Sequence, residues 1–363
     1  MARKILFTGF PGFLGAQLLP RVLECSPGAT ALCLVQKKFE QAAKARAAEL
    51  IGAQPSLEGR IELVEGDITR HGLGLPDHSV LGDVVGIFHL AALYDLAVKR
   101  DLAMKVNLDG TVNVLGVAAH CDALQHFHYV STCYVSGRYP GAFREGDLSK
   151  GQHFNNFYEE TKYLAEVEVQ ERMREGLPAT IYRPSIVVGD SATGATQKYD
   201  GPYYIIRWIL KQPTRRALMP VVGDPSIFRI NVVPSDFAID AMAHLSAQQE
   251  SQGKVFALAD PDPMTVAELL DELERATGRR LINMPLPLRT AKWAVRHVPG
   301  VYRLMGIPAE AIDYFVHPTY YDTTNTVEAL RGSGIEAPSL RNYLPNLVSF
   351  VREHPNISSQ AMG

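Results

Sequence analysis

Residues 3–15 read RKILFTGFPGFLG, an apolar run that ends in three glycines at GxxGxxG spacing. The run predicts a buried strand, and the glycines predict a tight turn that leads directly into a helix. Such a turn needs Gly9 for its curvature, Gly12 for close approach of a pyrophosphate, and Gly15 for close packing of helix and strand. We therefore expect a dinucleotide here, with further contacts from Thr8, Phe10, Phe13 and Leu14.

Short apolar runs alternate with helical patterns through the first half of the chain, which is the rhythm of βαβ units. The expected strands are residues 3–8, 31–36, 61–65, 86–90, 126–131 and 179–187. Their near-continuous apolar character fits a parallel sheet with helices on both faces. The predicted fold class is therefore α/β, a Rossmann-type doubly wound parallel sheet with a smaller C-terminal substrate-binding region.

The rhythm of strands and helices breaks after Gly189, which sets the expected domain organisation. We expect residues 1–190 to form the cofactor-binding domain, with 229–260 returning to it. Residues 191–228 and 261–355 would form the substrate-binding region, and 356–363 a flexible tail. In the later part, Thr265 and Glu268 form a capping-box pattern that predicts the start of a helix.

The composition is that of an ordinary soluble globular protein, with 36 Lys and Arg against 39 Asp and Glu among 363 residues. This near-neutral balance disfavours nucleic acid as a partner. The four cysteines follow no metal-ligand spacing, so we expect a reducing compartment and neither a zinc site nor any other metal site. The sequence contains no apolar run of bilayer length, and we expect a cytoplasmic protein.

The residues at the end of the second expected strand indicate which nicotinamide cofactor the chain binds. A site for NAD usually places an acidic residue there, but this chain has Gln36, Lys37 and Lys38. Cations suit the 2′-phosphate of NADPH, so we expect NADPH rather than NADH, although paired lysines also occur at solvated helix starts. The third and fourth strands would complete the site with Asp67, Ile68, Leu90, Ala91 and Ala92.

Tyr158 and Lys162 lie four residues apart in a helical stretch, so their side chains share one face. A nearby ammonium favours the phenolate, which would bring a tyrosine closer to proton transfer at neutral pH. Thr132 ends the fifth expected strand, where ligands bind in doubly wound folds. These three residues are the predicted catalytic constellation.

The motifs together resemble the extended short-chain dehydrogenase/reductases, whose pattern is TGxxGxxG, xHxAA, NxxGT, a Ser/Thr strand end and YxxxK. Within that family the chain looks most like the thioester and fatty acyl-CoA reductase branch. The supporting segments are TGFPGFLG, CLVQKK, RIELVEGDIT, YVSTCYVSG, YEETKYLAE and IYRPSIVVGDSATG. The branch usually carries Arg where this chain has Gln36, so the NADPH preference depends on the two lysines.

The resemblance implies roles for individual residues. Tyr158 would be the catalytic acid, Lys162 its pKa modulator and ribose anchor, and Thr132, rather than Ser131, the hydroxyl that polarises the substrate carbonyl. The remaining implied cofactor contacts are Asn107, Pro184, Ser185 and Ile186. The implied substrate contacts, besides Thr132, are Cys133, Tyr199, Tyr203 and Tyr204.

The leading functional hypothesis is NADPH-dependent reduction of an acyl thioester to an aldehyde, with further reduction to the alcohol left open. In a rival mechanism the Cys133 thiolate takes the acyl group covalently. Other interpretations of the fold are a steroid-type ketone or alcohol dehydrogenase, a nucleotide-sugar epimerase or dehydratase, and a dinucleotide sensor without catalysis.

The expected partners follow from these interpretations. The activated acyl group would arrive on CoA or on an acyl carrier protein, and the resemblance implies a homodimer through the helices that hold Asn107 and Tyr158. Residues 286–305 place four basic side chains on one helical face: Arg289, Lys292, Arg296 and Arg303. This face could rest on a membrane surface, cap the substrate cleft, or meet a carrier protein or the phosphates of CoA.

Overall fold

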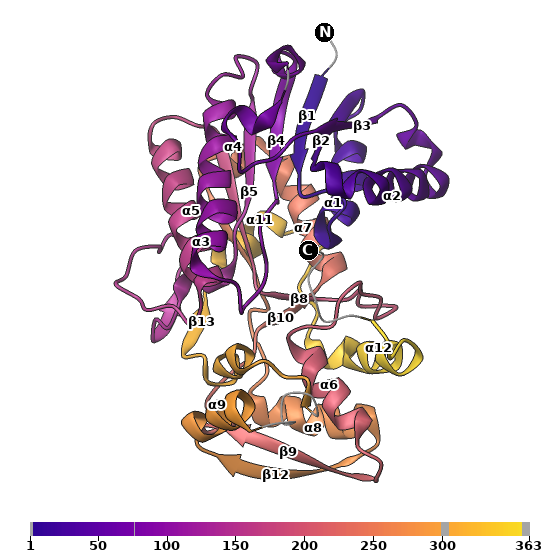
Figure 1. Cartoon of the computed structure of the whole chain (residues 1–363), viewed down its shortest axis with the longest axis vertical. Coiled ribbons are helices and arrows are strands. Elements are labelled where there is room, and N and C mark those ends of the chain that lie inside the picture. The colour runs from indigo at the N-terminus through magenta and orange to yellow at the C-terminus, as the bar shows by residue number, and fades with distance from the viewer. Residues whose placement is uncertain (1–2, 76, 299–304, 358–363) are drawn as a thin grey trace.

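The computed structural model describes residues 3–75, 77–298 and 305–357. Its centre is a parallel sheet of seven strands in the order β11-β7-β5-β4-β1-β2-β3 (Figure 1). The strands are β1 (Arg3–Thr8), β2 (Ala29–Val35), β3 (Ile61–Glu65), β4 (Val84–His89), β5 (His126–Val130), β7 (Ala179–Pro184) and β11 (Val255–Leu258). The strand order reverses beside β1, which confirms the predicted doubly wound fold.

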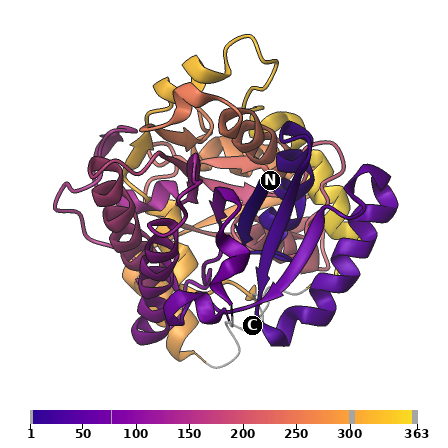
Figure 2. The same ribbon diagram turned by 90° about the horizontal axis from the view of Figure 1, so that it is seen from above.

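Helices cover both faces of the sheet (Figures 1 and 2). One face carries α1 (Phe13–Cys25), α2 (Glu40–Ala53) and α7 (Ser235–Ser246), which share an apolar core with the strands. The other face carries α3 (Arg100–Ala103), α4 (Gly110–Ala118) and α5 (Phe157–Arg174). The continuous apolar strands are explained by this double cover, because both faces exclude water.

The apolar run that predicts a single strand over residues 179–187 forms two strands instead. β7 ends at Pro184, and β8 (Ile186–Val188) pairs with β10 (Val232–Pro234) in a separate small parallel sheet. The switch occurs at Ser185, whose N–H still bonds Leu258 of β11 at 3.0 Å, while the N–H of Ile186 bonds Asn231 at 3.3 Å. The chain therefore leaves the main sheet at its carboxyl edge.

A second lobe, called the C-terminal lobe below, lies beneath the sheet in Figure 1. It consists of α6 (Pro202–Lys211), β9 (Arg216–Val222), α8 (Val266–Thr277), β12 (Arg280–Leu286), α9 (Leu288–His297), the 3₁₀ segment η8 (Ala309–Val316) and α12 (Leu340–Glu353). The predicted capping box starts α8: Thr265 Oγ1 accepts from the Glu268 N–H at 3.2 Å, and Glu268 accepts from the Thr265 N–H at 2.8 Å.

One later segment joins the sheet half, which the sequence did not predict. β13 (Thr319–Tyr321) pairs with β6 (Gly141–Phe143), and α11 (Thr324–Leu330) contacts β11 and α7. The buried carboxylate of Glu145 holds this segment by accepting from the N–H groups of Asn325 and Thr326 at 2.5 and 3.2 Å. Residues 261–355, expected as one substrate-binding segment, are therefore divided between the two halves.

Short 3₁₀ turns connect the larger elements: η1 (Lys37–Phe39), η2 (Pro55–Leu57), η3 (His71–Gly74), η4 (His78–Leu81), η6 (Cys133–Ser136) and η7 (Gln249–Ser251). A π-helical turn, η5 (Met104–Asp109), precedes α4. Within the described ranges, the helices are too short or too polar to cross a bilayer.

Candidate active site

The glycine turn between β1 and α1 is so tight that side chains would not fit. Gly9 has φ of +93°, and a Cβ there would lie 2.9 Å from the Ala91 nitrogen. A Cβ on Gly15 would lie 2.5 Å from the Gly9 carbonyl oxygen, which already accepts from the Gly12 N–H at 2.9 Å. The turn thus brings bare backbone to the N-terminus of α1, a geometry that fits a pyrophosphate.

The side chain of Ser185 gives a second test of whether a dinucleotide fits. Ser185 lies between β7 and β8 at the carboxyl edge of the sheet, and its hydroxyl is buried with no hydrogen-bond partner among the described residues. Buried hydroxyls are normally hydrogen-bonded, so a polar group of a ligand suits this place. Together with the glycine turn, this hydroxyl fits a nicotinamide cofactor that lies across the sheet edge.

A chain of hydrogen bonds under the turn was not predicted from the sequence. Thr8 Oγ1 accepts from the N–H groups of Leu90 and Ala91 at 3.2 and 3.1 Å and lies 2.9 Å from Nδ1 of His89. His89 Nε2 lies 2.9 Å from the hydroxyl of Thr111. Burial lowers the pKa of His89 to about 3, so the imidazole is neutral. Thr8, which His89 contacts, therefore fixes the backbone after β4 against the start of the glycine turn, and Ala92 is the next residue of that backbone.

At the adenosine end of the expected cofactor site, one of the expected residues already forms hydrogen bonds within the protein. The Asp67 carboxylate accepts from the N–H and hydroxyl of Thr69 at 2.9 Å. Burial alone would raise the pKa of Asp67, but hydrogen bonds from Thr69 and Gln36 outweigh it and lower the pKa. Ile68 is buried, whereas Lys37 and Lys38 are exposed in η1. The lysines thus remain accessible to a phosphate.

Tyr158 and Thr132 come together where α5 meets the carboxyl end of β5. Burial raises the pKa of Tyr158, and a hydrogen-bonding interaction with Thr132 opposes that rise. Thr132 caps the start of η6: its hydroxyl accepts from the Tyr134 N–H at 3.2 Å and donates to the Pro184 carbonyl at 3.3 Å. The phenol is therefore protonated at neutral pH and shares its site with a second hydroxyl.

Lys162 lies on the same face of α5 but is held by β5. Its ammonium donates to the hydroxyl of Tyr129 at 2.9 Å and to the carbonyl of Val130 at 2.8 Å. Burial lowers the pKa of Lys162 to about 7, against an opposing effect of Glu166. The sequence predicts that Lys162 lowers the pKa of Tyr158, and this role stays a prediction. In this structure burial raises the pKa of Tyr158, and the Thr132 hydroxyl opposes that rise.

Asn107 fastens the loop after β4 to α5. Its side-chain oxygen accepts from the Leu93 N–H at 2.7 Å, and its amide nitrogen donates to the Thr161 hydroxyl at 3.0 Å. It lies in the π-helical turn η5, an irregular geometry that often occurs at functional sites. Asn107 therefore positions the neighbours of Tyr158, with its amide committed to protein groups.

The residues on either side of Thr132 form hydrogen bonds with buried groups of the protein. The Ser131 hydroxyl donates to Glu166 at 2.5 Å, and Glu166 forms a buried ion pair with Arg183 at 2.6 Å. The Cys133 thiol donates to the Arg183 carbonyl at 3.0 Å, and burial raises its pKa far above neutrality. A thiolate at Cys133 is therefore disfavoured, which argues against the rival covalent mechanism.

The three tyrosines expected at the substrate lie mostly in the core of the C-terminal lobe. The Tyr199 hydroxyl donates to the His354 carbonyl at 2.8 Å, and the Tyr203 hydroxyl accepts from the Gly189 N–H at 2.8 Å. Both are buried there and hold the backbone in place. Tyr204 instead belongs to an apolar cluster with Val222 and Ile312.

A different set of tyrosines surrounds Tyr158, and no sequence motif marks them. The Tyr94 ring contacts the Tyr158 ring edge to face with centroids 4.9 Å apart. The Tyr314 hydroxyl donates to the buried carboxylate of Glu159 at 2.7 Å, and its ring contacts Tyr134 edge to face at 4.8 Å. Because Tyr314 comes from η8, the C-terminal lobe contacts α5 at the residue after Tyr158.

Two basic side chains in α9 form ion pairs within the lobe. Lys292 binds Asp313 at 2.6 Å, and Arg296 binds Glu310 at 2.9 Å, so both tie α9 to η8. Trp293 on the same helix is 57% exposed. Arg303 lies outside the described residues. These two cations of the expected basic face are therefore already neutralised by ion pairs within the lobe.

The family model described as "Male sterility protein", an NAD-binding family, matches residues 7–242. A linear gramicidin synthase protein of Brevibacillus parabrevis is 30% identical over 74% of this chain and 5% of its own length. Isonitrile lipopeptide synthase of Streptomyces coeruleorubidus is 28% identical over 93% of this chain and 23% of its own length. The chain thus spans less than a quarter of either relative.

A solved structure gives a match over nearly the whole chain. The terminal R domain from the myxalamid PKS-NRPS biosynthetic pathway is similar with a TM-score of 0.83 and 27% identity, covering 98% of this chain and 91% of that one. The similarity therefore includes the C-terminal lobe as well as the sheet half.

Proposed function

Because the chain belongs to the male sterility protein family of NAD-binding domains, we propose that it is an NADPH-dependent reductase of acyl thioesters. The observation that carries the proposal is that Tyr158 of α5 meets Thr132 at the carboxyl end of β5, at the same edge of the sheet as the glycine turn after β1. Similarity to synthetase proteins and to a terminal R domain supports a thioester as the activated acyl group.

The residues that would hold the cofactor divide into two groups. Backbone of the glycine turn and the N-terminus of α1 would bind the pyrophosphate, while Lys37 and Lys38 would bind the 2′-phosphate. Lys162 would hold the nicotinamide ribose, and the unpartnered hydroxyl of Ser185 would bind near the nicotinamide. When bound, NADPH supplies a hydride for the carbonyl carbon of the substrate.

The proposed work of the protein is to stabilise negative charge on the carbonyl oxygen. Tyr158 donates a hydrogen bond to this oxygen as charge develops in the transition state. Thr132 does the same once its hydroxyl proton, which the Pro184 carbonyl accepts in this structure, turns to the substrate. Burial keeps the Tyr158 phenol protonated, so Tyr158 can also deliver the proton to the oxygen. The resulting hemithioacetal then breaks its carbon–sulfur bond: the hydroxyl proton leaves the oxygen as the carbonyl forms, and the departing sulfur takes up a proton, which releases a thiol and an aldehyde.

We propose an acyl carrier protein, rather than free CoA, as the source of the acyl group. The two relatives are synthetases several times longer than the matched segment, so their corresponding segment works as part of a multidomain protein. The name of one relative, a lipopeptide synthase, is compatible with an acyl group that carries a hydrocarbon portion.

A substrate panel tests the proposed reaction. We would follow NADPH and NADH oxidation with acyl-CoA thioesters, acyl carrier protein thioesters, ketosteroids and simple aldehydes, and identify the products by mass spectrometry. We expect thioesters to be consumed with NADPH preferred over NADH. Activity confined to ketones would contradict the proposal and assign the chain to the dehydrogenases.

A further inference from the structure

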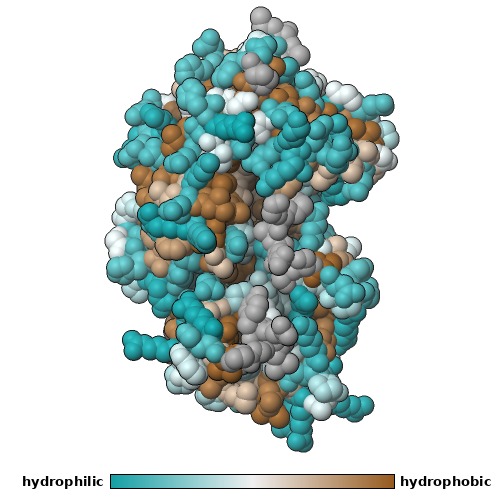
Figure 3. Space-filling model, viewed as in Figure 1, coloured by the Kyte–Doolittle hydropathy of each residue, from teal (hydrophilic) through white to brown (hydrophobic). Residues whose placement is uncertain are grey.

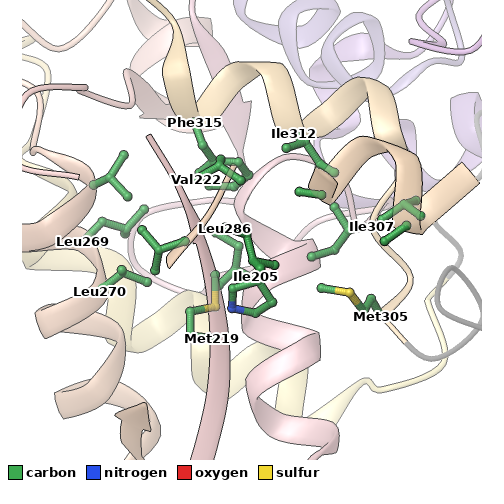
Figure 4. A pocket seen from close by; sticks show the side chains of 16 residues that line it. Ile205, Met219, Val222, Leu269, Leu270, Leu286, Met305, Ile307, Ile312 and Phe315 are labelled. Carbon is green, nitrogen blue, oxygen red and sulfur yellow. The ribbon is translucent and has the colours of Figure 1, made fainter. Parts of the chain in front are cut away.

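Three buried polar side chains beneath the sheet edge have no part in the proposed chemistry: His89 of β4, Thr111 of α4 and Tyr129 of β5. This edge faces the C-terminal lobe across a hollow (Figures 1 and 3). The lobe itself surrounds a cavity of about 150 Å³, but the side chains that line it are apolar and offer nothing to a proton or an ion (Figure 4). The three polar side chains, in contrast, are linked to one another and to Lys162.

Lys162 is a buried cation without a carboxylate partner. It is 3% exposed, and among the described residues its ammonium donates to neutral oxygens alone. These are the Tyr129 hydroxyl at 2.9 Å and the Val130 carbonyl at 2.8 Å. Glu166, the carboxylate one turn later in α5, binds Arg183 of β7 at 2.6 Å instead. Burying a charge without a counter-ion is costly, so the neutral groups around Lys162 determine whether it stays charged.

Tyr129 contacts Lys162 through its ring as well as its hydroxyl. The Lys162 Nζ lies 4.4 Å from the centroid of the Tyr129 ring, and the face of an aromatic ring attracts a cation. The ring of His89 contacts the Tyr129 ring with centroids 5.6 Å apart. The titratable groups around Lys162 are therefore Tyr158 and Glu166 from its own helix, Tyr129 from β5 and His89 from β4.

The hydrogen bonds of Thr111 determine which way the Tyr129 hydroxyl points. The Thr111 hydroxyl donates to the Asn107 carbonyl at 2.7 Å, so its oxygen can only accept from its other neighbours. One of these is His89 Nε2 at 2.9 Å, which must therefore carry the ring proton. The other is the hydroxyl of Tyr129, which interacts with Thr111 by hydrogen bonding. The Tyr129 proton thus goes to Thr111, and the Tyr129 oxygen is left to accept from Lys162.

We propose that Tyr129 is a positioning residue that keeps Lys162 charged for the cofactor, with Thr111 and His89 holding the Tyr129 hydroxyl in its accepting orientation. The inference rests on the proposed function, in which Lys162 holds the nicotinamide ribose. An ammonium has three N–H groups. Tyr129 and Val130 accept two of them, which leaves the third for a hydroxyl of the ribose. The inference also gives His89 and Thr111 a role within the HLAA and NLDGT segments.

Titration of Lys162 by NMR tests the inference directly. We would label the lysines with ¹³C at Cε and follow the shifts against pH in the cofactor-free protein, assigning Lys162 by the signal lost in Lys162→Arg. Tyr129→Phe keeps the ring but deletes the acceptor. The pKa of Lys162 should therefore fall by about one to two pH units, which corresponds to one lost hydrogen bond to a charged group.

Tyr182→Phe is the matched control for this titration. Tyr182 is a buried tyrosine of the neighbouring strand β7, and its hydroxyl lies 3.1 Å from His128. Its ring belongs to the apolar core on the opposite face of the sheet from Tyr129. Deleting its hydroxyl makes the same chemical change away from Lys162, so the pKa of Lys162 should stay at its wild-type value.

The pH profile of NADPH use shows whether the charge on Lys162 serves the cofactor. Because Tyr129→Phe lowers the pKa of Lys162, the decline in kcat/KM for NADPH should begin about one to two pH units lower than in the wild type. At about pH 8 the variant should be about 10- to 100-fold less active, and the difference should shrink toward acid pH. A lowered pKa of Lys162 without thioester reduction would overturn the proposed reaction and retain the role of Tyr129.

Other outcomes would overturn the inference. These are an unchanged pKa of Lys162 in Tyr129→Phe, an equal fall in Tyr182→Phe, or a lowered pKa that leaves the pH profile for NADPH in place. If Tyr129→Phe does not fold, Thr111→Val replaces it, because it frees the Tyr129 hydroxyl to turn. The pKa of Lys162 should then fall in Thr111→Val and return in Thr111→Ser, which restores a hydroxyl, and any other pattern contradicts the inference.

Discussion

The two halves of the molecule differ in what their interiors contain. Beneath the sheet edge, buried polar groups are bonded to one another, as in the bridge from Thr8 through His89 to Thr111 and in the ion pair of Glu166 with Arg183. The C-terminal lobe instead surrounds an apolar cavity. Proton transfer needs donors held at fixed positions, and the polar contacts beneath the sheet edge provide them. The difference supports the proposal that the sheet half performs the chemistry.

The sharpest way to test this division is to remove the proton donor. Tyr158→Phe keeps the ring but deletes the hydroxyl that pairs with Thr132. We expect kcat to fall about 10²- to 10⁴-fold, the usual contribution of general acid catalysis. NADPH affinity, measured by quenching of protein fluorescence, should change less than about twofold, since the phenol is not its main anchor. Full activity in this variant would refute the assigned role.

The pKa of Lys162, about 7, predicts a pH effect confined to the sheet half. Because burial lowers this pKa, the ammonium is charged below pH 7 and becomes neutral above it. If the charged form binds the ribose, kcat/KM for NADPH should fall about tenfold per pH unit above about 7. Lys162→Arg stays charged throughout this range and should abolish the decline in its residual activity. A decline that persists in Lys162→Arg would assign it to another group.

Cofactor preference should depend on the exposed lysines of η1. Replacing Lys37 and Lys38 by Ala should raise KM for NADPH about tenfold or more and leave KM for NADH unchanged, because charge-assisted hydrogen bonds to a phosphate are lost. Lys44→Ala is a suitable control, since Lys44 lies nearby in α2 but pairs with Glu40 at 2.5 Å. Equal changes in KM for NADPH and NADH would show that the lysines do not bind the 2′-phosphate.

The smallest expected effect concerns the joint between the halves. Tyr314→Phe removes the hydroxyl that donates to the buried carboxylate of Glu159. We expect the free energy of unfolding, from urea titration, to fall by about 1–3 kcal/mol, the usual cost of losing a hydrogen bond to a charged group. Tyr320→Phe, at a tyrosine that is 43% exposed, should change it by less than about 0.5 kcal/mol. If both variants lowered the free energy of unfolding equally, the hydrogen bond from Tyr314 to Glu159 would not specifically connect the two halves.

The sheet half could be predicted from the sequence because local geometry dictates its residue types. Gly9 and Gly15 are required by the space around them, and the paired hydroxyls follow from a strand end and a helix face. The single strand expected over residues 179–187, by contrast, was wrong at Ser185, since a continuous apolar run does not reveal which sheet each part joins.

The walls around Tyr158 could not be predicted in the same way. Tyr94 contacts its ring, and Tyr314 contacts the neighbouring Tyr134 and Glu159, from segments far apart in sequence that no spacing rule links. The family resemblance implied Tyr199 and Tyr203 as substrate contacts, yet their hydroxyls bind backbone groups. The cavity likewise arises from apolar residues whose periodicity indicates burial but not the shape of the space that they leave.

The ratio of thiol released to NADPH oxidised tests the central claim most directly. We would measure both during complete turnover of octanoyl-CoA or an octanoyl carrier protein. We predict one thiol for each NADPH if reduction stops at the aldehyde, or one thiol for every two NADPH if it continues to the alcohol. NADPH oxidation with carbonyl compounds and no thiol release from any thioester would contradict this claim.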